Sequence, residues 1–510
     1  MLLSDMIYFG TGSLLYIILL SWLQKWLSLN FRSHWGKITI ALILTYLLSI
    51  LLNGTPMGYK LFVLCRDCLV AGLSGVAVHY LRSIKKPYAL ALSVLLVSLY
   101  VFWLYKPVIR QMVYARLPEM ENSSELLLEL KEGKTIESIM PTLEKYEIIY
   151  KQAYYPKNAS NTILDNYYML DVPKSQMHRF FGIKKKIRAN ASMEWLEVNE
   201  VFEVDLDVNE FTPPGTAAMS TINDPEYPYQ WGLRALRIQE MNTWLQESGH
   251  QPKKTALICV LDTGIERVHA DINSNYLSFN TKDDVDDHGH GTHCGGVIAA
   301  VSNNAIGTAG ISFSNQHIRV TSIQVLGKNG VGSQNTIIDG IIKAADLGAD
   351  VISLSLGGPS NDGKQRAFEK AIQYANEAGA IVIVAAGNSN TNAKKFAPAN
   401  AAGVITVAAI DSQLSKASFS NTTSDIKMKL AAPGVNIRST FIKNSYKDLN
   451  GTSMATPFIA GLAGIIKSYQ PDITTEEMYE LLESTAIETK SPKTIGKLPN
   501  AFEALNKLLN

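Results

Sequence analysis

Three short segments of this chain carry an acid, a base and a nucleophile in the order Asp, His, Ser. Asp262 ends an apolar β-branched run before a Thr-Gly turn, and His290 opens the small-residue segment His-Gly-Thr-His. Ser453 stands between a glycine turn and a run of small residues. A serine hydroxyl is a weak nucleophile at neutral pH, so it needs a base that takes its proton and an acid that orients the base. The segments predict Ser453 as nucleophile, His290 as general base and then acid, and Asp262 as the orienting group.

Acyl transfer through a serine also needs hydrogen-bond donors for the oxyanion that develops on the substrate. Asn388 follows the apolar run 380–384 and an Ala-Ala-Gly segment. A strand-end asparagine of this kind can aim its amide at the active centre. An asparagine-capped turn explains the same residues equally well, so both interpretations stay open on the residues alone.

The order Asp, His, Ser and the residues around each resemble the subtilisin-like serine protease family. The resemblance extends over residues 224–490 and, more weakly, over 122–205. It implies a serine endopeptidase that hydrolyses peptide bonds through an acyl-enzyme on Ser453. It also places the base at the first histidine of His-Gly-Thr-His, which favours His290 over two nearby histidines. These are His288 and His293.

The same resemblance assigns roles outside the triad. Asn388 takes the oxyanion role together with the backbone N–H of Ser453. Extended backbone on both sides of a groove lets a peptide bind as an added strand, and glycines allow close approach. The predicted walls of the groove are Ser355, Leu356, Gly357 and Gly358 on one side and Gly330, Val331 and Gly332 on the other. Two ordinary loops are the alternative.

A calcium site is implied by the resemblance alone. Members of the family hold Ca²⁺ with a loop after the catalytic-histidine helix, an aspartate after the first catalytic strand, and an acid or amide near the N-terminus of the domain. Oxygen-rich, irregular coordination suits this ion. The predicted ligands are Asp224, Asp271, Asn304, Ile306 and Thr308. A solvated asparagine turn is the alternative for the loop.

The catalytic residues need a scaffold, and residues 224–510 predict a parallel α/β sandwich. Apolar runs rich in Val and Ile alternate with helical stretches, which is typical of strands buried on both faces of a parallel sheet. The predicted strands include 255–261, 318–325, 350–355, 380–385 and 403–409, and the predicted helices include 335–347 and 364–378. Asp262 then lies at the carboxyl edge of the sheet, where α/β sites form.

Residues 122–205 predict a separate α+β domain. Leucines alternate over 126–130, and a helical apolar stripe follows Thr135. A second helix is predicted over 175–183, and a last strand over 193–204. The pattern β-α-β-β-α-β is that of a ferredoxin-like half-domain. Its place directly upstream of a protease resembles the subtilisin-type propeptide, which implies an intramolecular inhibitor and production as a zymogen; a permanent spacer is the alternative. The Pro- and Gly-containing residues 206–223 predict an exposed linker, in which self-cleavage is expected.

Residues 1–110 predict a membrane region. A cleavable signal peptide would explain one apolar run and not four. Each run approaches the ~20 residues that span a bilayer as a helix. The runs lie near 6–28, 38–53, 59–81 and 87–105. The predicted fold is therefore a subtilisin-like α/β parallel-sheet sandwich, preceded by a ferredoxin-like α+β propeptide domain and about four transmembrane helices.

Basic residues predict the orientation of the membrane region. Lys and Arg are more numerous in the first and third loops between the runs than on the opposite side. This bias favours those loops in the cytoplasm and both termini outside. We therefore expect a multi-pass protein of the cell membrane with an extracytoplasmic catalytic domain. Its expected partners are polypeptide substrates, its own propeptide domain and the lipid bilayer.

Composition excludes some classes of function. A formal net charge of +1 over 510 residues provides no field that would attract nucleic acid. The four cysteines do not form a disulfide framework, and the last two are predicted to be buried apolar groups. They are Cys65, Cys68, Cys259 and Cys294. A non-catalytic peptide-binding scaffold and a sensor or transporter with an accessory peptidase remain alternatives, but the complete set of triad and oxyanion residues favours the endopeptidase.

Overall fold

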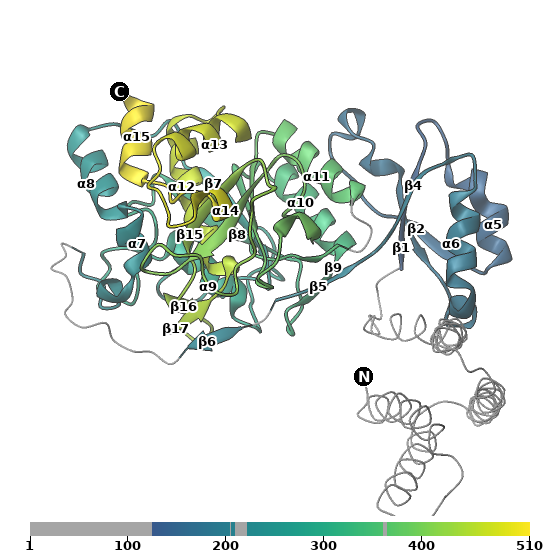
Figure 1. Ribbon diagram of the computed structural model, residues 1–510, viewed down its shortest axis with the longest axis horizontal. Coiled ribbons are helices and arrows are strands. Elements are labelled where there is room, and N and C mark those ends of the chain that lie inside the picture. Colours follow the sequence, from purple (N-terminus) through teal and green to yellow (C-terminus); the bar gives the residue numbers. More distant parts are fainter. Residues whose placement is uncertain (1–124, 205, 210–221, 361–364) are drawn as a thin grey trace, which may run out of the picture. The chain divides into compact units, whose positions relative to one another are not determined.

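Six parallel strands form the central sheet of the C-terminal domain in the computed structural model (Figure 1). The model describes residues 125–204, 206–209, 222–360 and 365–510. The strand order is β15-β14-β12-β10-β7-β8. The strands are β7 (Ala256–Asp262), β8 (Ile318–Gln324), β10 (Val351–Leu354), β12 (Ile381–Ala385), β14 (Val404–Ile410) and β15 (Lys429–Pro433). They are almost entirely buried, as expected for parallel strands that are covered on both faces.

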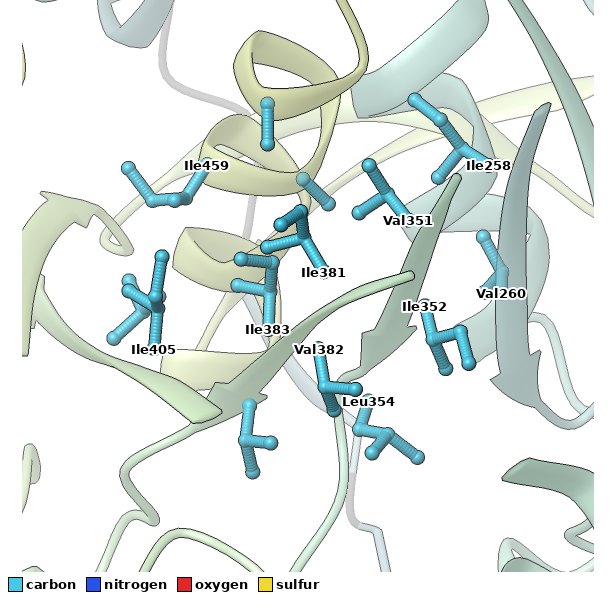
Figure 2. Packing of buried hydrophobic residues seen from close by; sticks show 14 of the residues in the cluster. Ile258, Val260, Val351, Ile352, Leu354, Ile381, Val382, Ile383, Ile405 and Ile459 are labelled. Atoms are coloured by element: carbon cyan, nitrogen blue, oxygen red, sulfur yellow. The ribbon is translucent and has the colours of Figure 1, made fainter. Parts of the chain in front are cut away.

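Helices cover both faces of this sheet. Helix α9 (His290–Ala299) packs against α12 (Thr452–Tyr469), and α10 (Gln334–Asp346) packs against α11 (Arg366–Glu377). The chain moves in opposite directions across the sheet from β7 to β8 and from β8 to β10, so right-handed connections place α9 and α10 on opposite faces. Figure 2 shows the alternation along β12, where Ile381 and Ile383 point toward Ile459 of α12 and Val382 points the other way.

Shorter elements surround the sheet. Strand β9 (Val331–Ser333) precedes α10, and the hairpin of β16 (Ile437–Phe441) and β17 (Ser445–Asn450) leads directly to α12. Strand β6 (Asp207–Asn209) adds to the edge of this hairpin by pairing with β17. The remaining elements are α7 (Trp231–Ala235), α8 (Ile238–Ser248), α13 (Thr475–Ser484), α14 (Pro492–Ile495), α15 (Ala501–Leu509), β11 (Gly358–Pro359) and β13 (Phe396–Ala397).

Residues 125–198 form a β-α-β-β-α-β domain with the strand order β2-β3-β1-β4 and antiparallel neighbours, which is the ferredoxin-like arrangement. Helix α5 connects β1 to β2, and α6 connects β3 to β4. Strand β1 is central and all its residues are buried. The elements are β1 (Leu126–Leu130), α5 (Met140–Lys145), β2 (Ile149–Gln152), β3 (Tyr167–Asp171), α6 (Phe180–Arg188) and β4 (Met193–Val198).

Two boundaries in this domain differ from the sequence prediction. The predicted second helix covers 175–183, whereas a 3₁₀ segment occupies Lys174–Arg179 and α6 continues beyond the predicted end. It continues because Ile187 extends the buried apolar stripe one turn further. The predicted last strand is divided, and its second part, β5 (Val201–Glu203), leaves the domain and pairs with β9 of the catalytic domain.

One part of the predicted fold is wrong. The sequence predicts about four transmembrane helices in residues 1–110, but no helix in the described part of the chain is long and apolar enough to cross a membrane. The four apolar runs themselves lie outside the described residues. Length and apolarity do not distinguish a lipid-facing helix from one buried in protein: α12 has 18 residues and all of them are buried inside the α/β domain. The fold is thus a parallel α/β sandwich preceded by a ferredoxin-like domain.

Candidate active site

The predicted acid and base are in contact. Asp262 is the last residue of β7, and His290 is the first residue of α9. The Nδ1 atom of His290 lies 2.8 and 2.9 Å from the two carboxylate oxygens of Asp262, and both side chains are buried. Gly291 permits this approach, because a Cβ atom there would lie 2.1 Å from the carbonyl oxygen of Gly264. The contact holds the imidazole with Nε2 directed away from the carboxylate, as a general base requires.

The electrostatics of His290 result from two opposing effects. Complete burial lowers the pKa of the imidazole, but the charge and hydrogen bond of Asp262 outweigh burial, and the net pKa is raised. Nε2 has no hydrogen-bond partner among the described residues. This atom is therefore available to accept a proton from a serine hydroxyl.

Asp286 holds the N-terminus of α9 in place. Its carboxylate accepts hydrogen bonds from the N–H groups of Gly289 (2.8 Å) and Thr292 (2.9 Å) and from the Thr292 hydroxyl (2.7 Å). Sequence reasoning did not assign a role to this residue. The available signal was an aspartate four residues before the predicted base, in a segment that begins a helix.

Ser453 lies in the first turn of α12, and its backbone is close to Cys294 of α9. Its backbone oxygen is 3.5 Å from Sγ of Cys294, and the side chains of Cys294, Asp262 and His290 approach within 4.8 Å of one another. The Ser453 hydroxyl donates a hydrogen bond to the carbonyl oxygen of Ser355 (2.9 Å). The Ser453 hydroxyl is therefore not hydrogen-bonded to Nε2 of His290 in this structure.

Two N–H donors converge beside Gly451. A Cβ atom at Gly451, where φ is 151°, would lie 3.4 Å from Nδ2 of Asn388 and 3.5 Å from the backbone nitrogen of Ser453. The Asn388 amide is oriented because its oxygen accepts hydrogen bonds from the backbone and hydroxyl of Thr452, both at 2.9 Å. The geometry suits an oxyanion that forms next to the nucleophile. Thr452, which sequence reasoning did not single out, sets this orientation.

The predicted walls of the groove lie on both sides of β5, a strand of the same chain. On one side β5 pairs antiparallel with β9, and the N–H of Val204 donates to the carbonyl oxygen of Gly330 (2.9 Å). On the other side, a Cβ atom at Gly358 would lie 3.2 Å from the ring of Phe202. That ring is buried and meets Phe368 edge-on, with ring centroids 5.8 Å apart. The predicted walls therefore flank an extended segment of the chain itself.

The individual wall residues differ in their exposure to solvent. Gly330, Gly332 and Gly358 are buried, and Val331 and Gly357 are partly exposed. The side chains of Ser355 and Leu356 are buried. Ser355 therefore faces the protein interior, and only its backbone borders the groove.

The predicted calcium ligands lie together, away from the triad. The buried carboxylate of Asp224 accepts hydrogen bonds from the backbone of Asn303 (2.8 Å) and Asn304 (3.0 Å). The buried carboxylate of Asp271 accepts from the Asn304 amide (2.9 Å) and from the Thr308 backbone (2.8 Å). The Ile306 side chain is exposed, so only its carbonyl group would serve as a ligand.

The charges of this cluster fit a cation. Burial raises the pKa of Asp271 to about 7, and the nearby charge of Asp224 adds to the shift against the lowering effect of the hydrogen bonds. Within residues 125–510, as far as the structure describes them, no Lys or Arg forms an ion pair with either carboxylate. Two buried carboxylates with amide, hydroxyl and carbonyl oxygens nearby are groups that Ca²⁺ binds.

The remaining histidines and cysteines near the site have other surroundings. His293 is buried against the carbonyl oxygens of Ile437 (2.9 Å) and Lys447 (3.2 Å), and burial lowers its pKa to about 3. The ring of His288 lies 6.3 Å from that of His290, between centroids. Cys259 and Cys294 are free and buried, as predicted. Cys65 and Cys68 lie outside the described residues.

Known proteins resemble this part of the chain. The model of the subtilase family matches residues 253–504. Thermitase of Thermoactinomyces vulgaris is 38% identical over 255 residues, which cover 49% of this chain and 86% of that protein. Subtilisin DY of Bacillus licheniformis is 37% identical over 237 residues, covering 44% and 82%. The thermostable alkaline protease of Halalkalibacterium halodurans is 36% identical over 270 residues, covering 52% and 70%. The matched segment holds all four predicted catalytic residues, and the chain belongs to the subtilase family of serine endopeptidases.

Proposed function

We propose that this serine endopeptidase is made as a zymogen, and that the ferredoxin-like domain is its intramolecular inhibitor. The observation that carries the proposal is the position of β5, which pairs with β9 in the groove where a peptide substrate would pair. A strand that occupies the groove excludes other peptides from the triad. A spacer domain, the alternative from the sequence, would have no reason to fill it.

Contacts between the two domains support a tight inhibitory complex. The carboxylate of Glu197 accepts hydrogen bonds from the Gln334 side chain (2.6 Å) and from the backbone N–H of Arg366 (3.0 Å) at the start of α11. The amide oxygen of Asn199 accepts from the backbone N–H of Asn335 (2.9 Å) at the start of α10. Acceptors at helix N-termini satisfy N–H groups that have no partner within the helix.

The pairing of β5 and β6 also limits where self-cleavage takes place. Strand β5 ends just before Val204, whose N–H donates to the carbonyl oxygen of Gly330. Strand β6 begins at Asp207 and pairs with β17, the strand that precedes Ser453. From these two pairings we infer that the cut falls between Val204 and Asp207. Most of the linker that the sequence predicts at 206–223 lies outside the described residues.

Mass spectrometry of the mature N-terminus tests both statements. We expect the purified enzyme to begin at residue 205, 206 or 207, and we expect Ser453→Ala protein to remain one uncut chain. A wild-type enzyme that stays active without any cut would refute the zymogen proposal and would favour a permanent spacer.

We also propose that the enzyme is held at the cell membrane by its apolar residues 1–110, with the catalytic domain on the extracytoplasmic side. The support is the apolar composition of that region and the distribution of its basic residues. Treatment of intact spheroplasts with an external protease provides the test in Ser453→Ala protein, which cannot cut itself. Complete protection of residues 125–510 would contradict the orientation, and recovery of this variant in the soluble fraction would contradict attachment.

We further propose that Asp224, Asp271 and the loop at Asn304 hold a structural Ca²⁺ ion, which would neutralise the two buried carboxylates. An ion that binds only the native state stabilises it by mass action, by about 2.7 kcal/mol when the free ion exceeds the dissociation constant 100-fold. Thermal melting in millimolar Ca²⁺ and in excess chelator is the measurement, with Asp271→Asn as the variant that should lose the difference. Equal melting temperatures of the wild-type enzyme in Ca²⁺ and in chelator would show that the loop at Asn304 is an ordinary turn.

A further inference from the structure

The backbone carbonyl group of the nucleophile lacks its usual donor within its own helix. In an α-helix, the carbonyl oxygen of each residue accepts a hydrogen bond from the N–H four residues later. Four residues after Ser453 is Pro457, which lies inside α12 and has no N–H. Ser453 is buried, so its carbonyl oxygen needs a donor from elsewhere in the protein.

The hydroxyl group of Ser355 supplies this donor. Its Oγ atom donates to the Ser453 carbonyl oxygen at 2.8 Å, and in return the Ser453 hydroxyl donates to the Ser355 carbonyl oxygen at 2.9 Å. The Cys294 thiol also points at the Ser453 carbonyl oxygen, at 3.5 Å. A thiol is a weak donor, so it does not replace the hydroxyl. The two serines are thus joined by a reciprocal pair of hydrogen bonds.

We propose that Ser355 is a positioning residue for acyl transfer, acting through the backbone of Ser453. It follows β10 directly and is completely buried, so its side chain does not face the substrate groove. The hydrogen bond to Ser453 ties the first turn of α12 to the end of β10. This connection fixes the position of the Ser453 N–H, which lies beside the Asn388 amide, and the position of the Cα atom that carries the nucleophilic side chain.

The first test is Ser355→Ala in the full-length enzyme, measured after it has matured. We expect kcat to fall about tenfold with KM nearly unchanged, because the groove backbone is retained while a buried carbonyl loses its donor and the nucleophile is less well placed. The rate constant for labelling by a fluorophosphonate should fall by a similar factor. Ser353→Ala is the matched control: Ser353 lies on β10, is completely buried, and its hydroxyl has no hydrogen-bond partner in the described part of the chain. Its kcat should equal that of the wild-type enzyme.

The second test restores the missing donor. Pro457→Ala places an N–H four residues after Ser453, where it can donate to the carbonyl oxygen that Ser355→Ala leaves without its partner. We therefore expect Ser355→Ala to cost much less kcat in the Pro457→Ala background than in the wild-type background. A double-mutant cycle measures this difference, and circular dichroism melting of all variants shows whether they are folded.

Several outcomes would overturn the proposal. Wild-type kcat in Ser355→Ala would show that the hydroxyl has no effect on the reaction. Equal losses in both Pro457 backgrounds would show that it does not act through the Ser453 carbonyl, and an equal loss in Ser353→Ala would indicate general packing of β10. If Ser355→Ala does not fold, the double variant decides: a folded and active double variant supports the proposal, and an unfolded one contradicts it.

Discussion

The four helices that flank the central sheet begin in two different ways. Helices α9 and α12 begin at glycines with positive φ, and side chains of the catalytic domain itself hold their first N–H groups. Helices α10 and α11 begin at N–H groups whose acceptors are Asn199 and Glu197 of the ferredoxin-like domain. The first pair of N-termini carries the base and the nucleophile, whereas the second pair contacts the ferredoxin-like domain.

The two pairs of helix N-termini therefore have different neighbours within one sheet architecture. A helix N-terminus favours negative charge and hydrogen-bond acceptors. At α12 the acceptor of the first N–H is the Asn388 side chain, and at α10 and α11 the acceptors are side chains of the ferredoxin-like domain. Substitutions at the first pair should therefore abolish hydrolysis with the domains still docked. Substitutions at the docking face should weaken inhibition and leave the chemistry of the free enzyme intact.

The largest expected effect is that of Ser453→Ala. It removes the nucleophile at the start of α12, and the loss in kcat should be on the order of 10⁶-fold, a value that comes from subtilisin itself and not from this chain. Hydrolysis of a chromogenic peptide and fluorophosphonate labelling are the measurements. The variant should keep its domains docked and its chain uncut. Unchanged hydrolysis by purified variant would remove Ser453 from the mechanism.

Asn388→Ala should have the next largest effect. The amide is placed to stabilise the transition-state oxyanion more than the ground-state carbonyl, so kcat should fall with little change in KM. The expected loss is about 10²- to 10³-fold, again a range known from subtilisin. A defect mainly in KM would contradict an oxyanion role and would favour the asparagine-capped turn.

Phe202→Ala tests the contact between β5 and the catalytic domain. The ring is buried between Gly358 and Phe368, so its removal should weaken the attachment of β5 to the catalytic domain by about 3 kcal/mol. The delay between self-cleavage and full peptidase activity should shorten, while kcat of the activated enzyme stays the same. Tyr155→Ala is the control, because that side chain lies on the same domain and is 71% exposed. Equal delays in both variants would indicate that Phe202 does not anchor the strand.

The smallest expected effect is a pH dependence of docking. Burial raises the pKa of Glu197 to about 7 and outweighs the hydrogen bonds from Trp195 and Gln334 that lower it. The docked state therefore favours the protonated carboxyl group. Its contribution to docking is complete below the ordinary pKa of an exposed glutamate and is lost as the pH rises through about 7.

Hydrogen exchange of the β5 amides measures this dependence in the uncut Ser453→Ala chain. After correction for intrinsic exchange rates, protection should be greater at pH 6 than at pH 8. Glu197→Gln, which cannot ionise, should remove the difference. Protection that does not change with pH in the parent chain would show that Glu197 does not control docking.

Local patterns in the sequence were sufficient for most elements of the α/β domain, and they named the acid and the base that the structure brings into contact. The apolar runs at β7, β10 and β12 and the amphipathic stretches at α10 and α11 were predicted to within a few residues. Such patterns arise from burial on both faces of a strand or on one side of a helix, which is a local property of the chain. The prediction of about four transmembrane helices was wrong, because an apolar run alone does not specify whether lipid or protein surrounds it.

Only the tertiary structure decided which distant groups meet. Ser355 was predicted as a wall of the groove, yet its hydroxyl faces Ser453, 98 residues away in the sequence. Glu197 meets Gln334 across 137 residues, and nothing in the local composition of either segment indicates this contact. The sequence by itself determined which residues could perform acyl transfer, because their chemistry and immediate neighbours are written in short motifs. The structure decided how they are held and what fills the groove, because both depend on the packing of separate segments against one another.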